Sequence, residues 1–275
     1  MSMRIALCNE VLRHLPFEEQ CAVAATIGYD ALELAPFTLG ASPHRLSAGD
    51  TSNIRRALND AGLGMSGLHM LLQAPSGLSI TSEAPEVIER TMEVGKRLVA
   101  LCAELGGRYL VHGSGQQRRL RDGSEKEDRT RALAYFETMA VAAADAGVIY
   151  CIEALAPDRT NFITSIADAA TIVDAIGAPS LRTMLDCSHA AGSEQDSIPI
   201  LLERYLPTGH VVHMHANEVD GGGPGSGAID FAAILKTLAS LGYDATIGVE
   251  PFVYDPDPIT CAQQSIRHLR SCMTP

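Results

Sequence analysis

The chain has 275 residues, of which 46% are hydrophobic and 20% are charged, a composition that suits a globular protein with a large buried core. Its 33 acidic residues outnumber its 21 basic residues and give a net charge of −12. Binding to nucleic-acid phosphates requires clusters of Lys and Arg, so this charge argues against a nucleic-acid partner. The largest basic cluster, Arg118-Arg119-Leu120-Arg121, is expected to be a solvated loop.

The cysteines and the apolar segments indicate the expected cellular location. The seven cysteines are an odd number and form no Cys-x-x-Cys motif, which predicts reduced thiols in a cytoplasmic protein. The most apolar stretch, residues 139–156, is interrupted by Asp145 and Glu153, and the first residues do not resemble a signal peptide. We therefore expect neither a membrane partner nor export.

Short apolar segments alternate with amphipathic ones along the whole chain. The predicted strands are Arg4–Cys8, Ala31–Leu34, Met65–Met70, Tyr109–His112, Val148–Glu153, Leu181–Asp186, Val211–His215 and Thr246–Glu250. The predicted helices are Phe17–Ile27, Thr51–Ala61, Pro85–Leu105, Glu127–Ala146, Ser165–Ile176, Ile198–Tyr205, Phe231–Leu241 and Ile259–Met273. Glycine recurs where a helix gives way to a strand, as expected for a left-handed residue that ends a helix.

Eight strand-helix units in a chain of this length predict a single (β/α)8 TIM barrel that occupies residues 1–275 as one α/β domain. The alternative, a doubly wound sheet, would need a reversal of strand order and usually a glycine-rich turn after the first strand. The first predicted strand is followed by Asn9-Glu10-Val11, which lacks that turn.

Four polar side chains end consecutive predicted strands: Glu153, Asp186, His215 and Glu250. They lie about one strand-plus-helix unit apart, so parallel strands would bring them to one end of the barrel. Carboxylates placed together repel each other unless a cation lies between them. Oxygen and nitrogen ligands of this kind suit a divalent metal ion, whereas an isolated residue of the four could simply be an exposed strand end.

Several short motifs carry a family resemblance that covers essentially the whole chain. They are Gly28-Tyr29-Asp30-Ala31-Leu32-Glu33-Leu34, Ile152-Glu153, Leu185-Asp186-Cys187-Ser188-His189, Val212-His213-Met214-His215, Pro224-Gly225-Ser226-Gly227, Gly242-Tyr243-Asp244 and Val249-Glu250-Pro251. In this order and spacing they resemble the sugar isomerase/epimerase superfamily with the xylose isomerase-like TIM barrel. That superfamily includes ketose 3-epimerases, hydroxypyruvate isomerases, inosose dehydratases and, more distantly, the endonuclease IV branch.

The resemblance implies a metal-dependent isomerase or epimerase that acts on a small sugar or keto-sugar. Glu153, Asp186, His215 and Glu250 would bind one Mn²⁺, Mg²⁺, Co²⁺ or Zn²⁺ ion, which polarises the substrate carbonyl as a cis-enediolate forms. Glu153 and Glu250 would act as the paired acid and base. His189 matches the family position that contacts substrate, and a homodimer is an assembly that the family often adopts.

Other polar residues near predicted strand ends have more than one interpretation. His69 and His112 end the third and fourth strands and could contact substrate or serve a structural role. Glu33 ends the second strand and could hydrogen-bond substrate or metal ligands. His213 lies two residues before His215 on the same strand face, and we expect it to be a hydrogen-bonded core residue.

Two departures from the ketose 3-epimerase pattern concern the substrate. Where that family carries a Glu after the first metal ligand and an Arg after the metal His, this chain has Arg159 and Gly221. Because Arg forms bidentate pairs with carboxylates and phosphates, Arg159 could bind an anionic group of the substrate. The alternative is a salt bridge within the loop.

The glycine-rich run Gly221–Gly227 has two interpretations. Loops after the seventh strand of such barrels often bind phosphate, but this run lacks the Lys of a Walker motif. We therefore expect a mobile loop over the site.

Three other functions share parts of this pattern. A dehydratase of the inosose or dehydroshikimate type would use the same first proton abstraction and then expel a β-hydroxyl. An endonuclease IV-like hydrolase could use His69, His112 and His189 as further zinc ligands, but the loop after the seventh strand lacks an Asp-x-His pair. A non-catalytic sugar-acid binding protein would have no need of four metal ligands.

Overall fold

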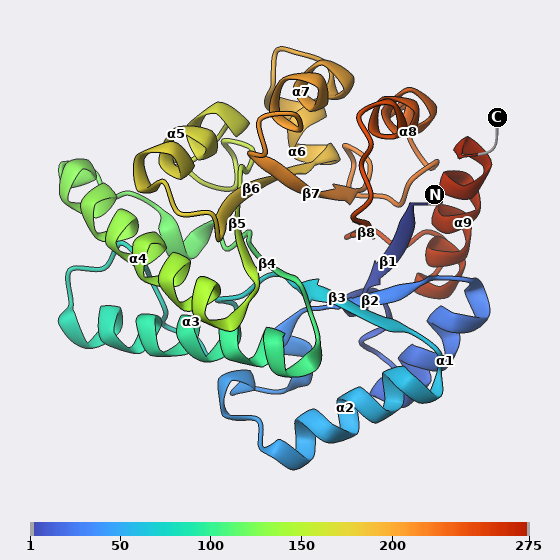
Figure 1. The fold of residues 1–275 in the computed structure, drawn as a ribbon, viewed down its shortest axis with the longest axis horizontal. Helices are drawn as coiled ribbons and strands as arrows, with labels where there is room; N and C mark the ends of the chain where they lie inside the picture. The colour runs from blue at the N-terminus through green and yellow to red at the C-terminus, as the bar shows by residue number, and fades with distance from the viewer. Residues whose placement is uncertain (1–2, 274–275) are drawn as a thin grey trace. The chain divides into compact units, whose positions relative to one another are not determined.

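The computed structural model describes residues 3–273, in which strands and helices alternate (Figure 1). The strands are β1 (Arg4–Cys8), β2 (Ala31–Leu34), β3 (Gly64–Leu68), β4 (Tyr109–His112), β5 (Ile149–Glu153), β6 (Leu181–Asp186), β7 (Val211–Ala216) and β8 (Thr246–Val249). The helices are α1 (Phe17–Ile27), α2 (Ala48–Asp60), α3 (Pro85–Leu105), α4 (Glu125–Ala146), α5 (Ile166–Ile176), α6 (Cys187–Ser193), α7 (Ile198–Tyr205), α8 (Phe231–Ser240) and α9 (Pro258–Cys272).

The strands follow one another in the sheet in chain order, from β1 to β8, and form a closed barrel. The closure pairs β1 with β8 in parallel, with Ile5 opposite Ile247 and Leu7 opposite Val249. The predicted (β/α)8 barrel is therefore confirmed, and the doubly wound alternative, which leaves two sheet edges open, is excluded.

The chain divides into two compact units. The first comprises Met1–Leu34, Ile54–Ser66 and Met184–Pro275, and the second comprises Ala35–Asn53 and Gly67–Thr183.

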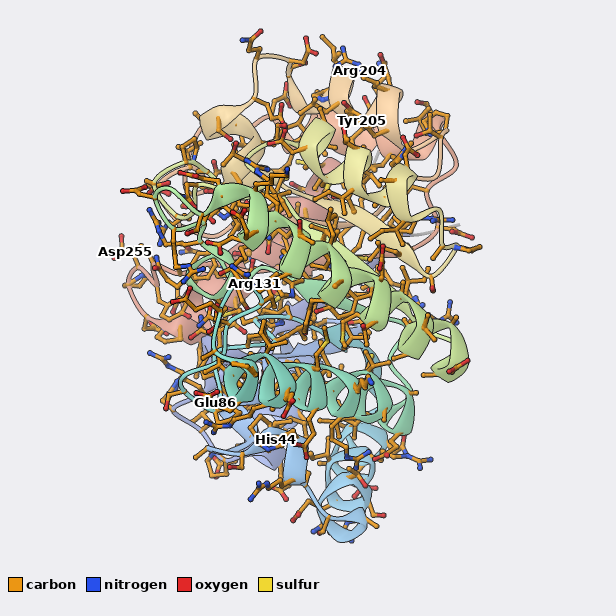
Figure 2. All side chains as sticks on the ribbon, turned by 90° about the vertical axis from the view of Figure 1, so that its left-hand side faces the viewer. His44, Glu86, Arg131, Arg204, Tyr205 and Asp255 are labelled. Carbon is orange, nitrogen blue, oxygen red and sulfur yellow. The ribbon has the colours of Figure 1, made fainter. Side chains whose placement is uncertain are left out.

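In the first unit, β1 lies between β2 and β8, and its residues from Ile5 to Cys8 are buried. Helix α9 contacts both α1 and β8, and α7 packs beside α8 (Figure 1). The Tyr29 hydroxyl donates a hydrogen bond to the carbonyl of Ala262 on α9 at 2.8 Å. At the end of α7, the guanidinium of Arg204 lies over the ring of Tyr205 (Figure 2).

In the second unit, β4 pairs with β5, and the long helices α3 and α4 run beside each other (Figure 1). The first turn of α4 is held by the buried carboxylate of Asp128, which accepts hydrogen bonds from Arg121 and Arg131. Arg131, labelled in Figure 2, also donates to the carbonyl of Thr81 at 3.1 Å. These contacts fix the loop before α4 to the helix.

Most predicted elements are confirmed within a few residues, and the differences lie mainly at their ends. Strand β8 stops at Val249, so that Glu250 is the first residue beyond it. The short helix α6 was not predicted; it begins directly after Asp186, whose side chain accepts a hydrogen bond from the backbone of His189. None of the seven cysteines, all of which lie within the described residues, forms a disulfide bond. Within residues 3–273, no helix combines the length and apolarity that a membrane span requires.

Candidate active site

Three of the four predicted metal ligands belong to the first unit, and the structure brings them together. Asp186 ends β6, His215 lies near the end of β7, and Glu250 follows β8. Each offers a ligand atom, and these atoms lie within 4.8 Å of one another. All three side chains are buried. Parallel strands deliver their last residues to the same end of the barrel, which is why residues far apart in sequence meet here.

His215 uses both ring nitrogens within this group. Nε2 lies 2.8 Å from Glu33 Oε1, and Nδ1 lies 2.9 Å from Glu250 Oε2. Burial alone would lower the pKa of His215, but the carboxylates of Glu250 and Glu33 outweigh it and raise the pKa well above its ordinary value. The imidazole is thus held between two carboxylates.

Glu33, at the end of β2, is buried and contacts two histidines. Its second oxygen lies 3.2 Å from Nε2 of His213, whose Nδ1 lies 3.2 Å from the carbonyl of Thr246. Burial would raise the pKa of Glu33, but His215 and His213 lower it well below its ordinary value. His213 is the hydrogen-bonded core histidine that the sequence predicts, and Glu33 contacts a predicted metal ligand.

Asn217, which was not among the predicted site residues, connects two of the ligand-type residues. Its amide nitrogen donates to Asp186 Oδ2 at 2.7 Å and to the carbonyl of Glu250 at 3.2 Å, and its oxygen accepts from the backbone of Ser188 at 2.9 Å. The side chain is fully buried. A signal was present in the sequence, because Asn217 lies only two residues after His215, just beyond the end of β7.

The negative charge in this group supports the metal hypothesis. Burial raises the pKa of the Cys8 thiol well above its ordinary value, and the carboxylates of Glu33, Glu10, Glu250 and Asp186 raise it further. Several carboxylates thus act on one buried position, while the basic groups that the structure shows among them are the imidazoles of His213 and His215. A divalent cation held by oxygen and nitrogen ligands would offset this charge, so the residues present fit such an ion.

Glu153, the fourth predicted ligand, ends β5 in the second unit and is buried. Gly113, just after β4, lies so close that a Cβ at this position would collide with the Glu153 carboxylate. Any other residue at position 113 would force the Glu153 carboxylate to move from this place.

Arg118 corrects one sequence prediction, because it is fully buried and does not belong to a solvated loop. Its guanidinium donates to the carbonyls of His112 and Ile163, both at 3.2 Å. Burial lowers the pKa of Arg118 to about 10, while the negative charge of Glu153 opposes that shift. Arg118 therefore supplies a positive charge near Glu153. The sequence could not separate this buried arginine from its exposed neighbour Arg119, because the two residues have the same side chain.

His112, at the end of β4, has the surroundings of a structural residue. Its Nδ1 lies 2.8 Å from the Tyr150 hydroxyl, and its ring packs edge-on against Tyr135 and Phe136 of α4. Burial and the charge of Arg118 lower its pKa well below the ordinary value. Of the two roles that the sequence allowed, the geometry favours the structural one over substrate contact.

The remaining predicted site residues differ in exposure. His69 follows β3 in the second unit and is buried, whereas His189 lies half-buried on α6 of the first unit. The side chain of Arg159 is 67% exposed and its Nε lies 3.5 Å from Asp158, a contact that matches the loop salt bridge left open by the sequence. Substrate contact by His69, His189 and Arg159 stays a prediction.

Comparison with known proteins now identifies the family. The xylose isomerase-like TIM barrel family matches residues 21–272 of the chain. The chain belongs to this family. Over 207 residues it is 27% identical to an L-ribulose 3-epimerase of Mesorhizobium japonicum, which covers 74% of this chain and 67% of that protein. Over 269 residues it is 28% identical to a Streptomyces coelicolor protein provisionally assigned as a hydroxypyruvate isomerase. That alignment covers 90% of this chain and 89% of that protein.

Solved structures agree on the fold. The 3-keto-D-glucoside 4-epimerase of E. coli superposes with a TM-score of 0.82 at 20% identity, over 98% of this chain and 100% of that one. A D-psicose 3-epimerase crystallised in the presence of D-fructose superposes with a TM-score of 0.83 at 18% identity, over 98% of this chain and 99% of that one. At this level of identity, the likeness concerns the barrel itself.

The glycine-rich loop of this family member does not form a phosphate cradle. The backbone N–H of Gly222 donates to Asp220 at 2.9 Å, and those of Gly225 and Ile229 donate to the carboxylate of Glu218 at 3.1 and 3.0 Å. These donors are therefore already used by negatively charged groups, so the phosphate interpretation is wrong.

The same loop is also tied to its surroundings. The carbonyl of Gly221 accepts hydrogen bonds from Phe252 and Val253 at 2.7 and 2.9 Å. Gly225 has a φ of +90°, and a Cβ there would come within 2.6 Å of the His268 ring. These contacts argue against the mobile loop that the sequence suggested.

The endonuclease-like alternative also loses support in this family member. It would use His69, His112 and His189 as additional metal ligands. Within the described part of the chain, His69 belongs to a group of side chains that could hold a metal ion, but His112 and His189 do not.

Proposed function

We propose that this protein is a divalent-metal-dependent sugar isomerase or epimerase. The observation that carries the proposal is the buried group of Asp186, His215 and Glu250, whose ligand atoms lie within 4.8 Å of one another. The family relationship supports the reaction class, since the relatives include an L-ribulose 3-epimerase and a ketose 3-epimerase.

The proposed metal site has Glu153 as its fourth ligand. Strand β5 precedes β6 in the barrel order, and Glu153 ends β5 just as Asp186 ends β6. Both side chains are buried, and parallel neighbouring strands end on the same side of a sheet. The set would then contain three carboxylates and one imidazole, a combination that suits Mn²⁺, Mg²⁺, Co²⁺ or Zn²⁺.

The reaction would move a proton on the carbon next to a carbonyl. When bound, the cation would act as a Lewis acid toward the carbonyl oxygen. Glu153 and Glu250 would take the proton and return it, one on each face of that carbon. His189 would donate a hydrogen bond to the oxygen on which negative charge develops.

The protein side chains around these groups would keep them in place. Glu33 holds one nitrogen of His215, so the ring can turn only by losing that contact. Arg118 supplies a buried positive charge that acts on the carboxylate of Glu153. A keto-sugar or ketose is the proposed substrate, and His69 is proposed to contact it.

The test is proton exchange with solvent. Protein loaded with Mn²⁺ is incubated in D₂O with a panel of ketoses, keto-sugars and sugar acids, and carbon-bound deuterium is followed by NMR. We expect deuterium next to the carbonyl of at least one ketose or keto-sugar, with the epimer or isomer accumulating. A dehydratase would instead release water and leave an unsaturated or deoxygenated product.

The matched control is protein treated with a chelator and then reloaded. Loss of exchange on metal removal and its return on reloading are the expected results. Full exchange without metal would contradict the proposal, as would the absence of exchange across the panel in protein that holds one Mn²⁺.

A further inference from the structure

Asn217 occupies an unusual place beside the proposed metal site. It follows β7 directly, is fully buried, and makes three hydrogen bonds, all to residues of the first unit. The partners come from three segments: the end of β6 (Asp186), the start of α6 (Ser188) and the residue after β8 (Glu250). One amide therefore connects the segments that carry two of the proposed ligands.

The orientation of this amide is fixed by its backbone partners. The Ser188 backbone is a donor and requires the amide oxygen, while the Glu250 carbonyl is an acceptor and requires the amide nitrogen. The remaining N–H therefore has to be the group that meets Asp186 Oδ2, at 2.7 Å. A flipped amide would bring its oxygen against two acceptors and the nitrogen against a donor.

The two oxygens of Asp186 are thus held by two separate donors. Oδ1 accepts the backbone N–H of His189 at 2.8 Å, and Oδ2 accepts the Asn217 amide. Each carboxylate oxygen has two lone pairs, so both keep one for another partner. The carboxylate plane cannot rotate without breaking one of these bonds.

We propose that Asn217 is a positioning residue that orients Asp186, and through the Glu250 backbone the end of β8, for binding of a divalent cation. This inference rests on the proposed function. Hydrogen bonds to metal-ligating carboxylates set the direction of their lone pairs, and their loss typically costs about 10- to 100-fold in metal affinity or activity. Asn217 would act through Asp186 and would not touch the substrate.

The test compares Mn²⁺ affinity in Asn217→Ala and Asn217→Ser with that of the wild type, by isothermal titration calorimetry. Ala removes all three hydrogen bonds, and Ser keeps a polar group that is too short to reach all three partners. We expect Mn²⁺ to bind about 10- to 100-fold more weakly in both variants. Turnover should recover as Mn²⁺ is raised, because the acid and base remain.

Asn161→Ala is the matched control. That asparagine also bridges with its amide, to the backbone N–H and carbonyl of Leu120, both at 2.9 Å, but it lies in the second unit. It should lower stability slightly and leave the Mn²⁺ affinity unchanged. Denaturant unfolding of all variants separates stability from metal affinity.

The outcomes are distinguishable. Failure of the wild type to bind Mn²⁺ would overturn the proposed function itself. If the wild type binds Mn²⁺ while both Asn217 variants are less stable but bind it within twofold of the wild type, Asn217 is only a structural bridge and the inference is wrong. A weaker affinity for Mn²⁺ in the Asn161 control would also contradict it.

Discussion

Two histidines near strand ends, His215 and His112, have opposite surroundings. His215 in the first unit lies between the carboxylates of Glu33 and Glu250, which raise its pKa well above the ordinary value. His112 in the second unit lies among aromatic rings and bonds a tyrosine hydroxyl, and burial lowers its pKa well below the ordinary value. One has the partners of a metal ligand and the other those of a core residue.

The difference shows that a strand-end position predicts where a polar side chain lies, and its neighbours decide what it does. Histidine is neutral when it binds a metal and neutral when it packs in a core, so its own chemistry does not separate the two roles. The partners do separate them. Substitutions in the two regions should therefore have different effects on metal binding.

The largest effect is expected for Asp186→Ala, which removes a proposed ligand. Metal-dependent turnover should fall below detection and Mn²⁺ binding should be lost, as measured by calorimetry and by deuterium incorporation. Asp186 also caps α6, and loss of this cap should make unfolding easier by about 1 kcal/mol, to which loss of the hydrogen bond from Asn217 adds.

Asp257→Ala is the control for the helix cap, because Asp257 accepts the backbone N–H of Thr260 at the start of α9 in the same way. Asp257→Ala should lower stability by about as much as loss of the α6 cap does, and it should leave the Mn²⁺ affinity unchanged. Global unfolding of Asp186→Ala would show that this carboxylate is needed for the fold and would contradict the proposed role.

Glu153→Gln and Glu250→Gln should each slow turnover by about 10²- to 10⁴-fold, because the amide cannot accept the proton although it keeps a ligating oxygen. The measurement is kcat at saturating Mn²⁺, together with the rate of deuterium exchange. If both variants kept near-normal kcat and deuterium-exchange rates with the metal still bound, the two-carboxylate mechanism would be wrong.

Glu33→Gln should weaken Mn²⁺ binding by about 10- to 100-fold, since Glu33 holds the ring of His215. His112→Phe should leave Mn²⁺ affinity unchanged, because its contacts are to Tyr150 and the rings of α4. Equal losses of Mn²⁺ affinity in the two variants would contradict the different roles assigned to His215 and His112.

His112→Phe should instead change how stability depends on pH. The folded protein holds His112 neutral because its pKa is lowered, while the unfolded chain takes up a proton as the pH falls through about 6.5. The folded state of the wild type therefore loses stability as the pH falls below that value. The free energy of unfolding of the wild type, relative to that of His112→Phe, should be higher at pH 8 than at pH 5. A constant difference would mean that His112 titrates alike in both states.

The smallest effect is expected for Arg159→Lys. The side chain is largely exposed and lies next to Asp158, so KM for neutral ketoses should change little. If Arg159 binds an anionic group, KM for a matched carboxylated or phosphorylated sugar should rise, because an ammonium cannot reproduce the bidentate fork. Equal KM changes for both kinds of substrate would assign Arg159 to the loop salt bridge.

The sequence predicted the barrel because apolar strands and amphipathic helices alternate at a constant spacing, and helix ends carry glycine. It also predicted the meeting of Asp186, His215 and Glu250, since each lies at or next to the end of a strand. It missed Asn217 and the buried Arg118, whose roles depend on side-chain partners distant in sequence. For the glycine-rich run it left a phosphate site and a mobile loop as alternatives, because the glycines alone do not reveal that the carboxylates of Glu218 and Asp220 accept hydrogen bonds from the loop amides.

The most direct test of the proposed metal site is a crystal grown with Mn²⁺ and measured at the manganese absorption edge. We predict one anomalous peak, about 2.0–2.3 Å from side-chain atoms of Glu153, Asp186, His215 and Glu250. A single peak elsewhere, or no peak with these four side chains well ordered, would contradict the proposed metal site.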